Sequence, residues 1–366
     1  MSNYCLVIYT VLAIACPSVF AINTVATLDE AEAYLTVNPA RSIALLDQIA
    51  DIDKLPPELA IRRYVLLLRA AVPTNDMPRL IQVLDILFNY QHHAYFRQHV
   101  TAITSALGIW LRRNNYLHDA QSSFACSYTH STTERQRLTL TNSLALVARQ
   151  LNETDKARTL FIAARQMAQQ SGQLNIVAMA ENNLGMLALD EGNIAAAEPH
   201  FRAALAQYQA ISQRAGQISA GINLLFYFVL QQDVLSFQRL YTPTANLTSN
   251  FPNEAKQALL FWLHSRFMQL QGQPATAQMQ QQLREAFLLL EDNQVKTLIQ
   301  RNLATPLAVD VKAAPALSRQ NFNRPWFSSV VACNWPISSV TEQTHRQESE
   351  KSQAKQTQRS QPGLAL

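Results

Sequence analysis

Three histidines that lie close together in the sequence are the first residues to suggest chemistry. His92, His93 and His99 fall beside Tyr95, and imidazole is a common metal ligand and general base. Adjacent residues point to different faces of a helix, so His92 and His93 would not chelate one ion together unless further ligands came from elsewhere. We therefore expect these histidines at the surface or between helices, and we predict no metal site.

The sequence contains none of the short motifs that mark common enzymes. It has no phosphate-binding or dinucleotide-binding glycine loop, no nucleophile elbow and no HExxH zinc motif. Acid pairs such as Glu153 with Asp155 and Asp190 with Glu191 fall at predicted turns, where capping of the next helix is a simpler role than proton sharing. We predict that the protein is not an enzyme, has no catalytic residue and needs no cofactor.

Charged side chains are sparse. The chain has 30 Lys and Arg against 26 Asp and Glu, a net charge of +4, and charged residues make up 15% of it. Proteins that follow a nucleic-acid backbone need a dense basic surface. This composition therefore excludes nucleic acid as the expected partner.

The elements that must position any functional residue are predicted to be helices. The 366 residues include only 8 glycines, where the usual frequency would give roughly 25. Folds built from tight turns need glycine for positive φ angles, whereas the abundant Ala, Leu and Gln favour helix. The length is too great for one compact core, so we expect several domains or a repeat array.

A repeated pattern supports the repeat array. A pair made of Leu and a small residue is followed, one helical hairpin later, by an aromatic residue. The pairs are Leu107-Gly108, Leu144-Ala145 and Leu184-Gly185, with Leu224-Leu225 as a degenerate fourth, and the aromatic residues are Phe124, Phe161, Phe201 and Tyr241. Each aromatic residue follows the previous one at nearly the same interval.

Residues 182–208, NNLGMLALDEGNIAAAEPHFRAALAQY, carry the pattern most fully. They resemble the tetratricopeptide repeat, in which Leu-Gly/Ala in the first helix is followed by Ala-x-x-x-Phe-x-x-Ala in the second. The resemblance covers residues 101–241 and implies an all-α fold, a right-handed α-solenoid of stacked antiparallel helix pairs. Small residues at Gly185 and Ala197 would let two helices approach closely, while Phe201 would fill the groove between one hairpin and the next. The interval exceeds the standard repeat length of the family and is typical of the extended type, which is familiar among members that hold peptide segments in their inner groove. Together with the N-terminus described below, the resemblance implies an exported bacterial protein of this type.

The resemblance also implies a binding surface. In tetratricopeptide folds the first helices line a concave groove, and extended repeats use Asn at one place to hydrogen-bond the backbone of a bound peptide. Asn183 and Asn223 occupy that place, while the preceding units have Ser143, beside Asn142, and Ala106. The implied peptide-binding groove is lined by Asn142, Asn183, Asn223, Arg112, Arg149 and Asp190. The alternative is that these asparagines are ordinary solvated or capping residues.

The N-terminus resembles a secretory signal. Residues 4–22 are uncharged and largely apolar, and Val19-Phe20-Ala21 fits the residues before a cleavage site. An uncleaved membrane anchor and a lipoprotein are the alternatives, the latter because Cys16 ends a stretch like a lipobox. All three predict an exported chain, periplasmic or associated with the envelope, with membrane association through the N-terminus only in the last two.

The remaining sequence is divided by its periodicity. We expect a signal peptide or anchor at 1–21, degenerate helical repeats at 22–100, core repeats at 101–250, capping helices at 251–304, and an irregular then disordered tail at 305–366.

The C-terminal part contains two tryptophans and a cysteine that can contact the helical repeats. Trp326 and Trp335 are expected to pack back onto the last hairpin, with a binding segment as the alternative. Removal of a signal peptide would leave Cys126 and Cys333, which either form one disulfide or leave Cys126 as a buried free thiol.

Two functions fit this sequence. The leading hypothesis is a scaffold or adaptor of the cell envelope that binds a protein or peptide in the concave groove of the solenoid. The alternative is a sensory, ligand-responsive ectodomain of a signalling system. The sequence leaves the partner and the oligomeric state open.

Overall fold

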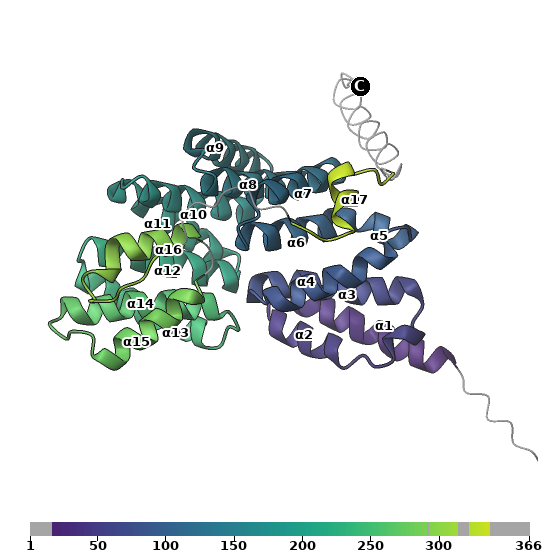
Figure 1. The fold of residues 1–366 in the computed structure, drawn as a ribbon, viewed down its shortest axis with the longest axis horizontal. Coiled ribbons are helices and arrows are strands. Elements are labelled where there is room, and N and C mark those ends of the chain that lie inside the picture. The colour runs from purple at the N-terminus through teal and green to yellow at the C-terminus, as the bar shows by residue number, and fades with distance from the viewer. Residues whose placement is uncertain (1–16, 291–292, 314–321, 337–366) are drawn as a thin grey trace, which may run out of the picture.

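The computed structural model describes residues 17–290, 293–313 and 322–336, and these residues form helices and turns without a strand. Figure 1 shows helices stacked in antiparallel pairs along a curved path from α1 (purple) to α16 (light green). The predicted all-α stack of helix pairs is thereby confirmed. Most of the predicted signal peptide, and the predicted disordered tail beyond residue 336, lie outside the described residues.

Seven helix pairs make up the stack. They are α1 (Pro17–Tyr34) with α2 (Pro39–Asp47), α3 (Pro57–Thr74) with α4 (Met77–Leu87), α6 (Val100–Arg113) with α7 (Leu117–Thr129), α8 (Glu134–Gln150) with α9 (Thr154–Gln170), α10 (Leu174–Asp190) with α11 (Ile194–Ala210), α12 (Arg214–Leu230) with α13 (Val234–Ser249), and α14 (Glu254–Leu270) with α15 (Ala277–Leu288).

Several shorter elements complete the fold. They are the 3-10 turns η1 (Ile52–Lys54) and η2 (Phe88–Tyr90), the helices α5 (Ala94–Gln98), α16 (Asn293–Ile299) and α17 (Phe327–Ala332), and the π-helical turn η3 (Gln300–Ala304). In the part of the chain that the structure describes, no helix is both long and apolar enough to span a bilayer.

The repeat is regular in space as well as in sequence. From α8 onward the first helices of successive pairs begin at a constant interval, at Glu134, Leu174, Arg214 and Glu254. One residue at the turn of each of six hairpins has a left-handed backbone, which ends the first helix and reverses the chain. These residues are Asn75, Asn115, Asn152, Gly192, Gln232 and Gly272, with φ between 56° and 81°. Only two of them are glycine, so a turn can recur in this chain without the residue that suits it best.

Glycine is required inside the hairpins for a different reason. A Cβ atom at Gly185 would lie 2.5 Å from the ring of Phe201, and one at Gly108 would lie 2.6 Å from the ring of Phe124. The predicted close approach at Gly185 is therefore confirmed. The ring of Phe201 packs against α10, the first helix of its own hairpin, and not only between hairpins as the sequence predicts.

The first helices of the pairs form one continuous layer. Contacts run from α1 to α3, α6, α8, α10, α12 and α14 in turn, and we call these seven helices the inner layer. The stack curves until its ends meet, where Asn253 Nδ2 at the start of α14 donates to the carbonyl oxygen of Pro73 in α3 at 3.0 Å. A cavity of about 620 Å³ lies at this junction between α2–α4 and α14.

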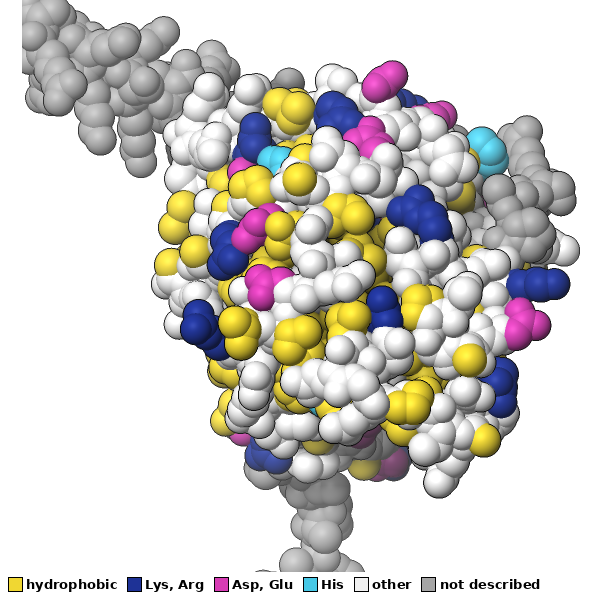
Figure 2. Space-filling model, turned by 90° about the vertical axis from the view of Figure 1, so that its left-hand side faces the viewer, with side chains coloured by type: hydrophobic (Ala, Val, Ile, Leu, Met, Phe, Trp, Pro, Cys, Tyr) yellow, Lys and Arg dark blue, Asp and Glu magenta, His cyan; other side chains and the backbone are white. Residues whose placement is uncertain are grey.

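Charge is scattered over the surface. Figure 2 looks at the end of the stack that lies on the left in Figure 1, where hydrophobic side chains gather in the middle of the face and Lys, Arg, Asp and Glu stand singly around them. This face offers no surface of a single charge sign, as the low charged content predicts.

The C-terminal residues return to the other end of the molecule. Residues 322–336, which we call the C-terminal strap, contain α17 and lie beside α5–α7 (Figure 1). Trp326 stacks on Phe88 with ring centroids 4.1 Å apart, and its Nε1 donates to Asp85 Oδ1 at 2.9 Å. Trp335 lies near the rings of Phe88 and Phe96.

The expectation that the two tryptophans pack on the last hairpin is therefore wrong. The last hairpin, α14 and α15, already packs against α16 and η3 through residues such as Leu298 and Leu303. An open aromatic surface remains around η2 and α5, much earlier in the sequence, and the tryptophans pack there.

Candidate protein-binding groove

The asparagines predicted to line the groove bond to one another across the inner layer. Asn183 Nδ2 of α10 donates to Asn142 Oδ1 of α8 at 3.0 Å. One helix further, Asn223 Nδ2 of α12 donates to Asn182 Oδ1 of α10 at 2.9 Å. Asn142 is fully buried and Asn223 nearly so, while Asn183 is half-buried. The amides thus form a ladder between neighbouring first helices.

The predicted charged residues behave similarly. Arg149 near the end of α8 is buried and makes a two-pronged contact with the carboxylate of Asp190 at the end of α10, with Nη2 3.0 Å from Oδ1. Arg112 occupies the corresponding place at the end of α6 and is also buried. The structure thus brings together Arg149 with Asp190 and Asn142 with Asn183, while Arg112 lies on an earlier helix. That these residues bind a peptide stays a prediction.

The chain covers part of its own inner layer. Gln294 of α16 donates to the carbonyl oxygen of Arg149, and Arg301 of η3 donates to those of Leu189 and Asp190. These carbonyl groups stand at the ends of α8 and α10, where a helix has no internal partner for them. The contacts fix α16 and η3 across the ends of the two first helices.

Burial shows that one stretch of α10, Leu184 to Leu189, is covered on all sides. Residues Leu184 to Leu189 are all buried, and six consecutive helical residues face every direction around the axis. Helix α10 contacts α11, the second helix of its own pair, and also α9, α8 and α12 of the neighbouring pairs. The side of α10 that these helices leave open is covered by α16 and η3. The inner layer is therefore closed over the second half of α10.

The N-terminal half of the inner layer contains an open hollow of about 410 Å³, which we call the N-terminal hollow. Its walls come from α1, α3, α5, α6 and the start of α8. The lining residues are Glu32, Arg62, Val65, Leu66, Arg69, Tyr95, Gln98, His99, Thr101, Ala102 and Gln136. It combines an apolar floor with hydrogen-bonding side chains, the composition of a typical binding site.

Two arginines and two acids form a charged network at this hollow. Arg62 Nη2 lies 2.6 Å from Asp29 Oδ1 and 2.9 Å from Glu32 Oε2, and Arg69 Nη1 lies 3.0 Å from Glu32 Oε1. The hydrogen bond from Arg62 lowers the pKa of Glu32, and Arg69 adds to this effect against the opposing effect of burial. Glu32 is therefore ionised at neutral pH, and Arg69 is exposed beside it. A carboxylate of a binding partner can take the place of Asp29 or Glu32 beside these two arginines.

The N-terminal hollow is not among the sites expected from the sequence. Arg62 and Arg69 lie seven residues apart on one face of α3, with Val65 and Leu66 between them. In the sequence this spacing is the one signal for the hollow, because it places two positive charges on either side of an apolar stripe of one helix. The N-terminal repeats are too degenerate to align with the family pattern, so no place-by-place comparison pointed to these residues.

Two of the three clustered histidines, His93 and His99, have separate structural roles. His93 caps α5, with its Nδ1 accepting from the backbone N–H of Tyr95, and His99 Nδ1 lies 2.8 Å from the Tyr95 carbonyl oxygen. The His99 ring also stacks on that of Tyr95 with centroids 4.5 Å apart. Among the residues that the structure describes, none of the three belongs to a group of three or more side chains that could hold a metal ion together.

A buried charge cluster holds three helices of the central repeats together. Glu181 of α10 accepts from Arg165 Nη1 of α9 at 3.1 Å, and His200 Nδ1 of α11 lies 2.6 Å from its other oxygen. Burial raises the pKa of Glu181, but the hydrogen bond from His200 and the charge of Arg165 outweigh it and leave the pKa below its ordinary value. The cluster therefore holds an ionised carboxylate in the interior.

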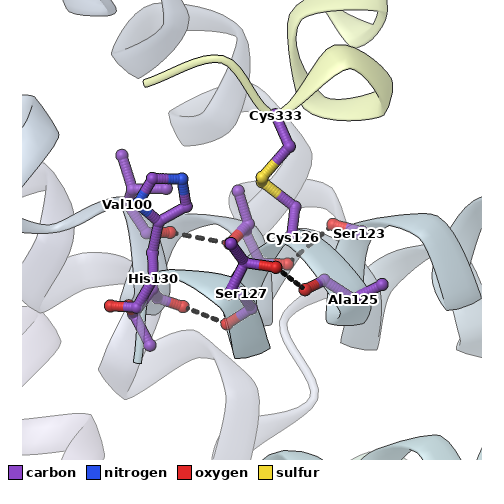
Figure 3. The surroundings of a disulfide bond; sticks show 10 residues. Val100, Ser123, Ala125, Cys126, Ser127, His130 and Cys333 are labelled. Atoms are coloured by element: carbon purple, nitrogen blue, oxygen red, sulfur yellow. Dashed lines mark hydrogen bonds between the residues drawn. A yellow bond between two sulfur atoms is a disulfide. The ribbon is translucent and has the colours of Figure 1, made fainter. Parts of the chain in front are cut away.

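The C-terminal strap is fixed by a disulfide. Cys126 of α7 is bonded to Cys333, which follows α17, across 207 residues of sequence. Figure 3 shows the bond rising from α7 to the strap, with His130 beside it. Of the two alternatives left open by the sequence, the structure has the disulfide.

Stacked helical hairpins with small residues at their contacts and a curved inner layer define an α-solenoid. Residues 136–210, which span α8 to α11, match the family model of the tetratricopeptide repeat. This part of the chain is therefore made of tetratricopeptide repeats, a fold that typically serves as a scaffold for protein binding.

Two further comparisons complete this picture. No curated protein matches the sequence. Among solved structures, the crystal structure of a Rap protein complexed with competence and sporulation factor matches with a TM-score of 0.49 and 11% sequence identity, over 78% of this chain and 99% of that chain.

Proposed function

We propose that this protein is an exported scaffold of the cell envelope that holds a protein or peptide partner against the N-terminal hollow. The observation that carries the proposal is the unequal cover of the inner layer. Its C-terminal half is packed under α16 and η3, whereas its N-terminal half keeps an open hollow of about 410 Å³. A partner that follows the inner layer finds accessible side chains there.

The side chains of the N-terminal hollow suit an extended or acidic segment of a partner. Arg69 offers a guanidinium at the rim, and Gln98 is an exposed amide. Guanidinium groups bind carboxylates and amides bind peptide backbones. Val65 and Leu66 form a floor for an apolar side chain.

Export is supported by two separate features. The N-terminal segment resembles a signal peptide, and disulfides such as Cys126–Cys333 persist in oxidising compartments and are rare in reducing ones. Recovery of the protein from cells and mass measurement of its N-terminus tests this. We expect a chain that begins at Ile22, and an intact Met1 together with reduced cysteines would contradict it.

Photo-crosslinking in the native cell tests the binding site. A benzophenone amino acid at Gln98 should crosslink a partner that mass spectrometry then identifies. The same amino acid at Gln238, an exposed glutamine on α13, is the matched control and should not crosslink that partner. Equal crosslinking from both positions, or crosslinking from Gln238 alone, would contradict the assignment.

A charge reversal gives a second measurement on the identified partner. Arg69→Glu should weaken binding about tenfold, because it places an acid beside Glu32 and removes a donor from the rim. Arg239→Glu, on the exposed side of α13, makes the same charge change elsewhere and should leave binding unchanged.

A further inference from the structure

His130 stands beside the disulfide and is held there by its backbone. It follows Cys126 by four residues at the end of α7, and its carbonyl oxygen accepts from Thr101 Oγ1 of α6 at 2.7 Å. A ring nitrogen and the two sulfur atoms all lie within 4.8 Å of one another. Figure 3 shows the ring next to the bridge.

One nitrogen of the His130 ring has a hydrogen-bond partner and the other has none. The ring hydrogen-bonds to the backbone of Cys333, and this bond favours the charged ring, so the ring nitrogen is the donor. Nε2 is buried and has no hydrogen-bond partner. Burial lowers the pKa of His130 despite the bond to Cys333, so Nε2 carries a lone pair at neutral pH. A buried acceptor without a donor is costly, and a disulfide has no proton to offer.

We propose that Cys126 and Cys333 form a redox-active disulfide, whose reduction by a dithiol is favoured because it gives His130 Nε2 a thiol proton to accept. The oxidised protein leaves this acceptor unpaired, whereas the reduced protein can form an S–H···N hydrogen bond. The dithiol form is therefore more stable, relative to the disulfide form, than in a cysteine pair that has no unpaired acceptor beside it.

The reaction is an ordinary thiol–disulfide exchange. A thiolate of the dithiol attacks Cys333 Sγ, because Cys333 is half-buried while Cys126 is only 3% exposed. The S–S bond breaks and its electron pair leaves on Cys126 Sγ. The second thiol of the dithiol then attacks the mixed disulfide and releases Cys333. The dithiol becomes a disulfide, and its two protons end on the two protein thiols, with that of Cys126 or Cys333 shared with His130.

The redox state controls the end of the C-terminal strap. Phe322, Phe327 and Val330 are buried and hold the first part of the strap without the disulfide. Beyond them Val331 and Ala332 are exposed, and Trp335 is only half-buried against Phe96 and the His130 ring. The disulfide is therefore the main attachment of residues 331–336, and its reduction should release Trp335.

The redox equilibrium tests the role of His130. The protein is the full chain with Cys5→Ser and Cys16→Ser, so that one thiol pair remains. It is equilibrated with mixtures of reduced and oxidised dithiothreitol in the presence of EDTA, quenched with a maleimide and analysed by mass spectrometry. His130→Leu should favour the disulfide about tenfold more than the parent protein does, a potential lower by ~30 mV.

Matched variants separate this effect from a change in folding. His118→Ala removes an exposed histidine from the same helix and should leave the equilibrium unchanged. His130→Gln keeps a hydrogen-bond acceptor and should lie closer to the parent than His130→Leu does. Far-UV circular dichroism checks that all variants are folded. An unchanged equilibrium in folded His130→Leu, or a shift toward thiols, overturns the proposal.

Tryptophan fluorescence tests the release of the strap. Reduction of the parent protein should shift the emission to longer wavelength as Trp335 enters water. The shift should disappear in Trp335→Phe and persist in Trp262→Phe, which changes a fully buried ring in α14. Emission that does not change on reduction, although the thiols are shown to be free, overturns the release of the strap.

Discussion

Glu181 shows how a single buried charge ties the central repeats together. Its carboxylate bonds to Arg165 and His200, so that α9, α10 and α11 share one ionised group. Glu181→Gln should destabilise the protein by about 2 kcal/mol at neutral pH, the usual cost of losing charge-assisted hydrogen bonds. Urea unfolding of both proteins measures the difference, and exposed Asp310→Asn serves as the control for loss of an acid.

The pH dependence of this difference has a definite sign. The pKa of Glu181 is lowered in the folded protein, so its stabilising effect is fully present above the unfolded pKa and is lost as the pH falls through the folded value. The gap between the parent and Glu181→Gln should therefore shrink in acid. A gap that stays constant from about pH 7 to about pH 3 would contradict an ionised Glu181 in the folded state.

Gln232 occupies a backbone conformation that suits another residue. Its φ of 56° is left-handed, and the corresponding turns of the neighbouring hairpins have Gly192 and Gly272. A side chain in this conformation costs roughly 1 kcal/mol that glycine avoids. Gln232→Gly should therefore stabilise the protein by about 0.5 kcal/mol after the entropy cost of glycine is subtracted.

Thermal unfolding measures the effect at this turn. Gly192→Ala is the converse change at the equivalent turn and should lower the stability by about 1 kcal/mol. Gln231→Gly, one residue earlier and in a right-handed conformation, should not stabilise. A gain from Gln231→Gly equal to that from Gln232→Gly would show that the turn conformation is not the cause.

The pair of helices α10 and α11 depends on the absence of a side chain at Gly185. Alanine is a better helix former than glycine by about 1 kcal/mol, yet a Cβ atom here would lie 2.5 Å from the buried ring of Phe201. Overpacking of this kind costs typically about 1–3 kcal/mol, so Gly185→Ala should be destabilising by about 1 kcal/mol overall.

A second substitution distinguishes a steric cause from any other. Phe201→Leu removes the part of the ring that meets the new methyl group and is destabilising alone. Combined with Gly185→Ala, it should cost less than the sum of the two single changes. Additive costs in urea unfolding would mean that the two positions are not coupled.

The same hairpins explain how much of the fold could be predicted. Gly185, Ala197 and Phe201 are close in sequence, and their contacts lie within one pair of helices, so the local pattern predicts the hairpin and its repeat. The strap packs Trp326 on Phe88, which lies far earlier in the chain, and only the curvature of the whole stack brings those two rings together. A repeat pattern carries no information on such contacts.

The candidate site was predictable only in part, for a related reason. Asn142, Asn183 and Asn223 were placed on the first helices, where the structure has them. Their bonding to one another depends on the spacing of neighbouring helices, which the sequence does not give. The cover over α10 was missed because α16 and η3 follow the repeats and do not share their pattern.

At the scale of the whole molecule, α16 and η3 act as a brace across the inner layer. Gln294 bonds to the end of α8 and Arg301 to the end of α10, while Leu298 and Leu303 are buried in the core shared with α12 and α14. The brace thus connects four first helices. It limits how far the C-terminal half of the stack can open to a partner.

Loss of one polar contact should loosen this brace without unfolding the helices below it. Arg301→Ala removes the donors to Leu189 and Asp190, at a cost of about 1 kcal/mol, so amides of residues 295–304 should exchange roughly fivefold faster with deuterium. Amides in α10 and α12 that exchange by global unfolding should change no more than in Arg239→Ala, the control on α13. Equal acceleration throughout the stack would instead mean that the brace and the repeats open as one cooperative unit, and that the covered half of the inner layer is inaccessible short of global unfolding.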